Sequence, residues 1–270
     1  MNYRHAFHAG NFADTMKHAL LVWLMRALTA KPKPLFVLDT HAGIGRYDLK
    51  AEPARRTNEA AGGIEILLKG AAPPLDDYIK LVRQLGLYPG SPVLIQALLR
   101  PTDRLACCEW HPEDVRVLRR AMAGDPRVHI HHRDGYEALG ALLPPPERRA
   151  LILIDPPFEA PDEFDRLAAA LKPAQARFPQ GVYAAWYPLK HRAPSRGFHE
   201  NLRLAGLRDI VAAEFFRAEP TDPARLTGCG LVLLNPPYGF EAAASEILDA
   251  LADRLAEPSG GFAVSRIADE

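Results

Sequence analysis

Short apolar runs, each closed by a polar residue, recur through most of this chain, and helical patterns fill most of the gaps between them. Apolar runs of this length that alternate with helices are typical of parallel strands buried on both faces of a sheet. The chain is therefore predicted to be an α/β protein built on a seven-stranded, mostly parallel sheet. The expected strands cover residues 35–40, 105–109, 128–132, 151–155, 182–187, 210–216 and 231–235.

The longest expected helix begins near Asn11, ends before Pro32 and is apolar on almost every side. Shorter helices are predicted at 91–99, 113–123, 162–171 and 198–205. No helix is expected between the last two strands, because the stretch 217–230 is short and rich in Pro and Gly. Those two strands should therefore pair antiparallel. A parallel sheet with one antiparallel strand near the C-terminus resembles the sheet of class I (Rossmann-like) methyltransferases.

An insertion is predicted after the first strand. Glu109, the acid that ends the second strand, follows Gly43 by 66 residues, whereas about 20 residues separate the equivalent groups in a plain βαβ unit. Roughly 40 residues are therefore inserted, and apolar residues at helical spacing within them predict small helices. We interpret 46–87 as a helical subdomain inserted into a Rossmann-like domain formed by 1–45 and 88–270.

The overall charge excludes a strongly basic nucleic-acid-binding protein, because 33 Lys and Arg balance 33 Asp and Glu. Any nucleic-acid surface must be a local patch. The three cysteines form no CxxC pair, which argues against a zinc site or a disulfide framework and fits a reducing cytoplasm. The apolar run at 19–25 is too short to cross a membrane, so a cytoplasmic protein without a membrane partner is expected.

Polar side chains close the first four predicted strands, at Asp39 with His41, Glu109, Asp134 and Asp155. Ligands of open α/β sheets bind beyond the carboxyl ends of the strands. Glu109 is suited to accept hydrogen bonds from a ribose diol, and Asp134 with Gly135 is suited to an adenine ring. The turn GIGRY at 43–47 lacks the third glycine of a dinucleotide fingerprint, so NAD fits poorly. S-adenosylmethionine, a nucleoside cofactor without phosphates, fits better.

Two similar turns follow predicted strands, LILIDPPFEA at 151–160 and LVLLNPPYGF at 231–240. Asp155 ends a parallel strand and should point toward the cofactor. Asn235 ends the antiparallel strand and should lie at the opposite edge of the sheet. We therefore predict that the first turn is the active site and that the second is structural, with Tyr238 capping the bottom of the core.

The DPPF turn suits methyl transfer to an amine on a planar ring, whose lone pair is delocalised and poorly nucleophilic. The Asp155 carboxylate and the Pro156 carbonyl can accept the two amine hydrogens and favour a tetrahedral nitrogen. The prolines hold both acceptors, and Phe158 can stack on the base, a contact worth roughly 1–3 kcal/mol. This chemistry requires no metal.

At this point a family resemblance becomes specific. The segments YRHAFHAGNFADTMKH, LDTHAGIGRY, YPGSP, CEWHP, RDGY, LILIDPPFE and WYP occur in order over most of the chain. Together they resemble the bacterial 23S ribosomal RNA adenine methyltransferases of the large-subunit methyltransferase J family. The resemblance implies a class I methyltransferase fold and N(6)-methyladenine in 23S rRNA as the product.

The resemblance also implies the roles of particular residues. Asp155 would be the catalytic acceptor, and Tyr3 would contact the RNA. Related enzymes have Tyr where this chain has Phe158, so stacking is kept while a hydroxyl hydrogen bond, worth about 0.5–1.5 kcal/mol, is lost. The residues expected around S-adenosylmethionine are Lys17, His18, His41, Ser91, Glu109, Asp134, Gly135 and Asp155.

Other candidate residues remain open between two interpretations. Trp186 either lines the base pocket or packs in the core. Basic residues near the strand ends either form a rim for phosphates or are solvated; they are Arg4, Lys17, Arg46, Lys190, Arg192 and Arg196. Strand alternation separates His132 from His129 and His131, so no metal site is expected there.

The partner predicted from these observations is 23S rRNA or a precursor of the large subunit, bound by a monomer. The target adenine must leave its stack to reach the pocket, so a flexible or stripped RNA region is expected, with the N-terminal segment as a lid. Two alternatives stay open. One is a DNA adenine methyltransferase, and the other is a non-catalytic RNA-binding assembly factor with the same fold.

Overall fold

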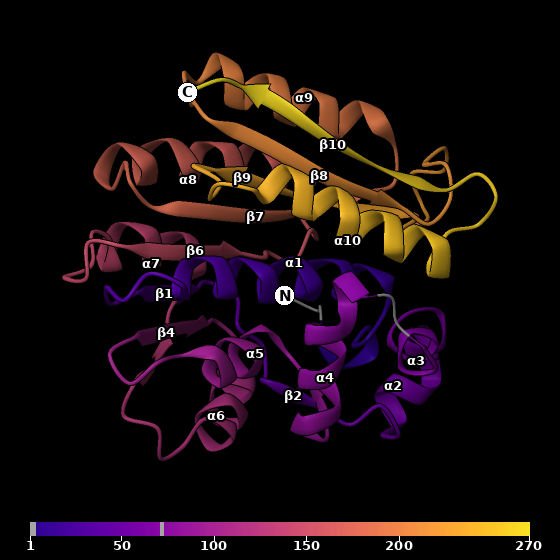
Figure 1. Cartoon of the computed structure of the whole chain (residues 1–270), viewed down its shortest axis with the longest axis horizontal. Helices are drawn as coiled ribbons and strands as arrows, with labels where there is room; N and C mark the ends of the chain where they lie inside the picture. Colours follow the sequence, from indigo (N-terminus) through magenta and orange to yellow (C-terminus); the bar gives the residue numbers. More distant parts are fainter. Residues whose placement is uncertain (1–3, 71–72) are drawn as a thin grey trace.

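The computed structural model describes residues 4–70 and 73–270, which form an α/β fold around one eight-stranded sheet (Figure 1). The strand order is β10-β8-β9-β7-β6-β1-β4-β5. All seven expected strands are present. The bounds are β1 (Phe36–Asp39), β4 (Arg104–Glu109), β5 (Val128–His132), β6 (Ala150–Ile154), β7 (Val182–Leu189), β8 (Ile210–Phe216), β9 (Gly228–Leu234) and β10 (Gly261–Ala268).

Strand directions separate the sheet into two parts. The strands β5, β4, β1, β6 and β7 run parallel, whereas β9 pairs antiparallel with both β7 and β8. The antiparallel pairing predicted for the last two of the seven strands is confirmed. The eighth strand, β10, was not predicted; it pairs antiparallel with β8 at the edge of the sheet. Its residues are half-buried or exposed, and its longest apolar run, at 262–264, has only three residues.

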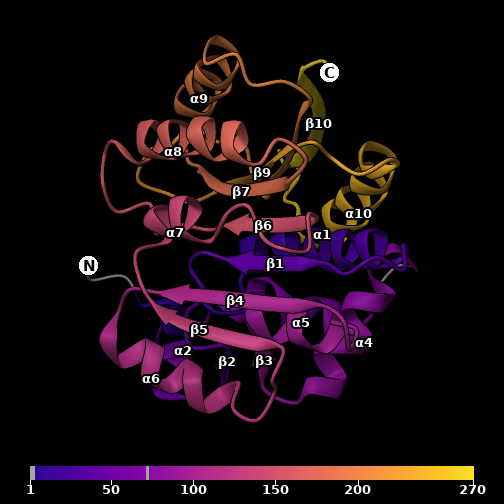
Figure 2. The ribbon, with the colours of Figure 1, turned by 90° about the vertical axis from the view of Figure 1, so that its left-hand side faces the viewer.

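Helices cover both faces of the sheet because each central strand is apolar on both sides. Val37 packs into the core beneath α1 (Phe12–Thr29), α5 (Ser91–Leu98) and α10 (Phe240–Leu255), while its neighbours Phe36 and Leu38 pack toward α7 (Gly135–Leu142), α8 (Glu163–Arg177) and α9 (Arg192–Leu204). Figure 2 shows α7 and α8 on one side of the strands and α1 and α10 on the other. The helix α6 (Pro112–Ala121) follows β4. The predicted helices are confirmed, while α7 and α10 were missed.

The long α1 is almost entirely buried, as its all-round apolar pattern predicts. The Asn11 side chain accepts a hydrogen bond from the Asp14 backbone N–H and begins the helix. No helix within the ranges 4–70 and 73–270 is long and apolar enough to cross a membrane.

The inserted segment lies beside α1 in Figure 1 and begins and ends in a short antiparallel pair, β2 (Arg46–Tyr47) with β3 (Tyr88–Pro89). Between them lie α2 (Glu52–Thr57), η2 (Glu59–Gly62), α3 (Ile64–Leu68), η3 (Pro73–Leu75) and α4 (Asp76–Leu85). Its buried side chains belong to the same core as α1. A separate subdomain with bounds 46–87 stays a prediction.

The NPPY turn lies at the edge of the sheet opposite to Asp155, because β9 runs against β7. The Asn235 side-chain amide donates to the carbonyls of Pro179 and Gly181, each at 2.7 Å, and Gly181 directly precedes β7. The prediction that Tyr238 caps the core is wrong, since its ring is fully exposed. Left-handed backbone at Asn235 and Gly239 turns the chain so that Phe240 packs inward instead.

Candidate active site

A cavity of about 870 Å³ lies at the carboxyl edge of the parallel strands. Residues from the ends of β1, β4, β5 and β6, from the start of α1 and from the inserted segment line it. Tyr3 falls outside the described residues. Every other site residue predicted from the sequence lines this cavity: Lys17, His18, His41, Ser91, Glu109, Asp134, Gly135, Asp155, Pro156 and Phe158.

Glu109 is held rigidly at the end of β4. Its Oε2 accepts a hydrogen bond from the Gly43 N–H at 2.9 Å, and its Oε1 accepts one from the His111 N–H at 2.7 Å. Burial raises the pKa of this carboxyl. Gly43 has a positive φ, and a Cβ there would lie 2.4 Å from the Tyr47 hydroxyl. The glycine turn therefore positions Glu109, whose remaining lone pairs can accept further hydrogen bonds.

Asp134 caps α7, because its Oδ1 accepts hydrogen bonds from the Tyr136 and Glu137 N–H groups at 2.8 and 3.1 Å. Gly135 is required by a close approach within the protein: a Cβ there would lie 2.5 Å from both His41 Cε1 and the Thr40 carbonyl oxygen. Burial lowers the pKa of His41 to about 4, so its imidazole is neutral near pH 7. These contacts fix one wall of the cavity.

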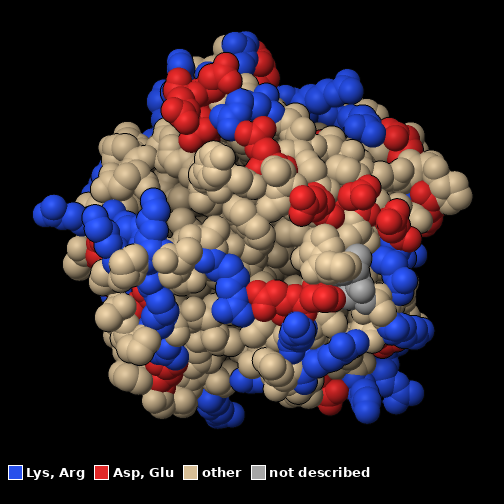
Figure 3. Space-filling view, viewed as in Figure 1, with Lys and Arg blue, Asp and Glu red and all other residues tan. Residues whose placement is uncertain are grey.

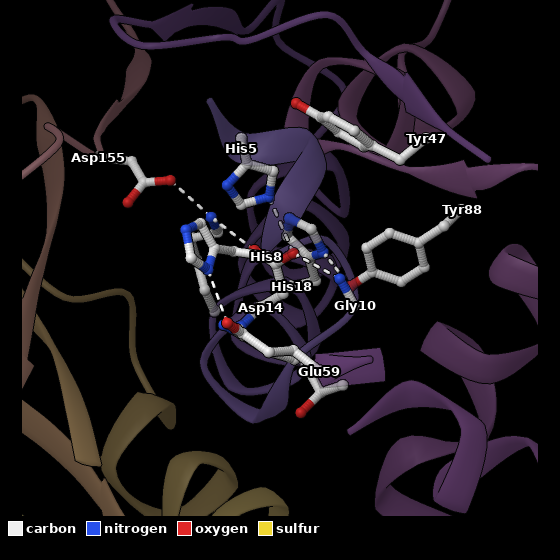
Figure 4. Close-up of polar contacts among 12 residues, drawn as sticks. His5, His8, Gly10, Asp14, His18, Tyr47, Glu59, Tyr88 and Asp155 are labelled. Atoms are coloured by element: carbon white, nitrogen blue, oxygen red, sulfur yellow. Dashed lines mark hydrogen bonds and ion pairs between the residues drawn. The ribbon is translucent and has the colours of Figure 1, made fainter. Parts of the chain in front are cut away.

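Asp155 belongs to a network of charged side chains, shown in close-up in Figure 4. Lys17 Nζ lies 2.5 Å from Asp155 Oδ2 and 3.1 Å from Asp14 Oδ1. The other oxygen of Asp14 contacts His5 Nε2 at 2.9 Å and accepts the Gly10 N–H at 2.9 Å. Burial alone would raise the pKa of Asp14, but His5 and Lys17 hold it well below its usual range. This network orients the Asp155 carboxylate.

Asp14 and His5 were not predicted as site residues. The sequence offered one signal for Asp14, since it stands three residues before Lys17 on the same helix and side chains at this spacing meet. The sequence offered no such signal for His5, because the contact of His5 with Asp14 depends on the turn that η1 (His5–Phe7) makes before α1.

His18 and Ser91 reach the cavity while bonded to buried partners. The His18 ring is almost fully buried, its Nδ1 lies 3.0 Å from the Tyr88 hydroxyl, and burial lowers its pKa to about 3. Ser91 Oγ donates to Asp39 Oδ2 at 2.6 Å. Asp39 is fully buried, which raises its pKa to about 7, and its Oδ1 has no hydrogen-bond partner among the described residues. A cofactor contact from His18 or Ser91 stays a prediction.

Phe158 forms part of an aromatic wall. Its ring packs edge-to-face against Phe164, with centroids 4.9 Å apart, and against Trp186, with centroids 5.9 Å apart. Trp186 lines the cavity and also packs on the core; a contact of its ring with the target base stays a prediction. Its neighbour Tyr187 is fully buried. The wall gives the cavity a flat apolar surface beside Asp155.

Three of the six basic residues proposed for a rim, Lys17 among them, are paired with acids. Arg4 contacts Glu113 and Asp114 at 2.6 and 2.7 Å, and Arg192 contacts Glu219 at 2.7 Å. Lys190 lines the cavity, as do Arg217 and Arg225, which sequence reasoning missed; Arg46 and Arg196 do not line it. On the face viewed in Figure 3, basic and acidic side chains are interspersed. No large basic field covers that face.

The strand order, the late antiparallel strand and the polar groups at the strand ends together define a class I (Rossmann-like) methyltransferase. Residues 32–268 match the family model described as "Ribosomal RNA large subunit methyltransferase D, RlmJ". The chain belongs to this family.

Similar proteins agree with this assignment. A Haemophilus influenzae protein named Ribosomal RNA large subunit methyltransferase J is 36% identical over 280 residues and covers 100% of both chains. An Escherichia coli protein of the same name is 38% identical over 271 residues, which is 97% of each chain. A crystal structure of a Legionella pneumophila protein has a TM-score of 0.89 and 36% identity, over 96% of this chain and 98% of that one.

Proposed function

We propose that this protein transfers a methyl group from S-adenosylmethionine to the exocyclic 6-amino group of an adenine in 23S rRNA or in a precursor of the large subunit. The observation that carries the proposal is that Asp155, Pro156 and Phe158 line one cavity together with Glu109 and Asp134. The family supports it, because the names of its two curated relatives specify the ribosomal RNA of the large subunit.

The cavity residues fit S-adenosylmethionine by chemistry and by size. The volume lies within the range of small-molecule sites, about 300–1,000 Å³. Glu109 would accept hydrogen bonds from the ribose hydroxyls, and Asp134 would accept one from the adenine amino group through Oδ2. Further contacts would come from Lys17, His18, His41, Ser91, Gly135 and Asp155. When bound, the cofactor supplies a methyl group that its sulfonium activates.

The residues of the DPPF turn would bind and orient the target base. Lys17 holds Asp155 Oδ2, and Oδ1 accepts no hydrogen bond from the described residues, so Oδ1 can accept one from the target amine. The Pro156 carbonyl would accept the second amine hydrogen and hold the nitrogen lone pair toward the methyl donor. Phe158, held by Phe164 and Trp186, would stack on the flipped base.

The test is a transfer assay with radiolabelled S-adenosylmethionine, in which deproteinised 23S rRNA and large-subunit assembly intermediates are offered separately. We expect N(6)-methyladenosine in at least one of them, identified by mass spectrometry of the nucleosides. Absence of transfer to both, or a different methylated nucleoside, would overturn the proposal.

Two further measurements test the remaining alternatives. Duplex DNA added as a competing acceptor should remain unmethylated; methylated DNA would indicate a DNA adenine methyltransferase. Calorimetry should show binding of S-adenosylmethionine, and a protein that binds RNA but not this cofactor would be a non-catalytic assembly factor.

A further inference from the structure

The rim of the cavity carries opposite charges on its two sides. The ends of β4 and β5 contribute Glu109 and Asp134. The far side, at the ends of β7 and β8, contributes three cations that we call the basic rim: Lys190, Arg217 and Arg225. A ligand that spans the cavity therefore meets Glu109 and Asp134 at one end and, at the other, three cations with one carboxylate, Glu257.

Strand direction places the basic rim beside Asp155. The strands β7 and β8 both run antiparallel to β9, so they run in the same direction and end at the same edge of the sheet as β6. Lys190 directly follows β7, and Arg217 directly follows β8. Arg225 lies in the loop that leads back to β9. All three therefore lie at the edge where the DPPF turn presents its acceptors.

The basic rim is less neutralised than the other cations near the cavity. Arg217 Nε and Arg225 Nη2 lie 3.7 and 3.6 Å from the same oxygen of Glu257, which is too long for a hydrogen bond. One carboxylate thus offsets two guanidinium groups. Arg217 Nε is buried and has no hydrogen-bond partner among the described residues. The Lys190 side chain is exposed and forms no hydrogen bond or ion pair with another residue in the ranges 4–70 and 73–270.

Arg217 is also held in a defined position. The backbone N–H of Arg217 donates a hydrogen bond to the Thr227 carbonyl at 2.8 Å, and the backbone carbonyl of Arg217 accepts one from the Glu257 N–H at 2.7 Å. Its guanidinium reaches the inserted segment, where a Cβ on Gly62 would lie 2.6 Å from Nη1. Glycine at this position leaves room for the guanidinium. The backbone of Arg217 is therefore fixed, and its Nη groups, which donate no hydrogen bond to another described residue, are suited to bind a phosphate.

We propose that Lys190, Arg217 and Arg225 bind the phosphodiester backbone of the RNA strand that carries the target adenine. This inference rests on the proposed function, because it assumes that the base enters beside Asp155 and Phe158. The basic rim then holds the backbone on the side away from Glu109 and Asp134. Phosphate contacts position a strand without reading its sequence, so the basic rim sets affinity and register.

The experiment measures binding of a deproteinised 23S rRNA fragment to the full chain at several salt concentrations. The rim variant is Lys190→Gln with Arg217→Gln and Arg225→Gln. We expect its Kd for the RNA to rise roughly 10- to 100-fold near physiological salt. The slope of log Kd against log salt should fall by about 2, since each lost phosphate contact on a single strand contributes about 0.7. The Kd for S-adenosylmethionine should stay within about twofold.

A matched control removes the same charge elsewhere. Arg116→Gln with Arg119→Gln and Arg120→Gln changes three exposed arginines of α6 that do not line the cavity. We expect this variant to bind the RNA within about threefold of the wild type. Equal weakening by both triple variants, or an unchanged salt slope in the rim variant, would overturn the inference.

Two further outcomes keep the inference separate from the proposed function and from folding. A wild-type protein that binds the RNA through the basic rim but methylates nothing would contradict the proposed function and leave the inference standing. A wild-type protein with no affinity for the RNA would overturn the inference. If the triple variant does not fold, the single variant Lys190→Gln is measured instead, because this exposed side chain supports no other described residue. A Kd for the RNA and a salt dependence equal to those of the wild type would then contradict the proposal.

Discussion

The turns at 151–160 and 231–240 share one sequence pattern, yet they lie at opposite edges of one sheet. Asp155 leaves a strand parallel to its neighbours and lines the cavity, held by Lys17. Asn235 leaves a strand antiparallel to its neighbours and holds two backbone carbonyls. An apolar strand followed by a polar residue and two prolines is therefore not sufficient to make an active site, because strand direction decides which edge the polar group reaches.

The largest effect is expected from exchanging the polar residue of each turn. Asp155→Asn keeps the shape but replaces an acceptor oxygen with a donor, so we expect methyl transfer to fall by at least roughly 10²–10³-fold with an intact fold. Asn235→Gly keeps the left-handed backbone and should leave the rate within about threefold. Transfer assays on both variants, with circular dichroism as the folding check, compare the two turns; loss of activity in a well-folded Asn235→Gly protein would contradict our assignment.

The aromatic residue of each turn should give the next largest difference. Phe158→Ala removes a stacking surface worth about 1–3 kcal/mol, so kcat/KM for the RNA should fall roughly 5- to 150-fold. Tyr238→Ala removes a fully exposed ring and should change kcat/KM by less than about twofold. Steady-state kinetics measures both. Equal values for the two variants would mean that the base does not stack on Phe158.

The edge of the sheet that carries Asp155 also contains the buried carboxyl of Asp39, whose burial lowers the stability of the folded state. Asn235, at the opposite edge, has an amide that does not titrate. The folded-state pKa of Asp39 is raised to about 7 by burial, above its usual value of 3.8. Between these values the native state binds more protons than the unfolded state, so this group makes stability fall as pH rises from about 4 to about 7.

Replacing Asp39 with Asn should remove that loss. Relative to the wild type, Asp39→Asn should gain stability across pH 4–7, by up to a few kcal/mol at the upper end. His18 and His41, whose pKa values burial lowers to about 3 and about 4, act in the opposite direction and are unchanged in the variant. Urea unfolding at several pH values gives the difference. Asn235→Gly should keep the wild-type pH dependence, and a constant gap between Asp39→Asn and wild type would refute the assignment.

The smallest effect is expected from making the first turn more like the second. Phe158→Tyr gives the first turn the aromatic residue of the NPPY turn and adds one hydroxyl. A hydrogen bond from it would be worth about 0.5–1.5 kcal/mol, so kcat/KM should change by no more than roughly 2- to 12-fold. A larger loss would show that the wall formed with Phe164 and Trp186 has no room for the hydroxyl.

Much of the fold follows from local pattern, and the misses have local causes too. Seven strands could be predicted from the sequence, because a short apolar run indicates a buried strand without knowledge of the strands that pair with it. The edge strand β10 has an apolar run of only three residues, and it pairs with β8 at the edge of the sheet. The helix α10 was missed although Ala244, Ile247, Leu248 and Leu251 repeat at helical spacing. The helical pattern of α10 is therefore present in the sequence, although no helix was predicted there.

The site divides in a similar way. Glu109 and Asp155 were predictable because each is the polar residue that closes an apolar strand, and Asp134 because it follows the predicted strand at 128–132. The charge network through Asp14 and His5, and the basic rim at Arg217 and Arg225, were not. His5 and Asp14 are nine residues apart and meet across the start of a helix, whereas Arg217 and Arg225 meet Glu257, which is distant in sequence.

The sequence by itself determined the elements, the polar groups at strand ends and the family resemblance, since burial periodicity and motif spacing are local properties of a chain. Only the tertiary structure decided which basic side chains are neutralised by acids and why position 135 must be glycine. Each of those depends on distances between segments up to more than a hundred residues apart, such as Lys17 and Asp155, and no local pattern encodes them.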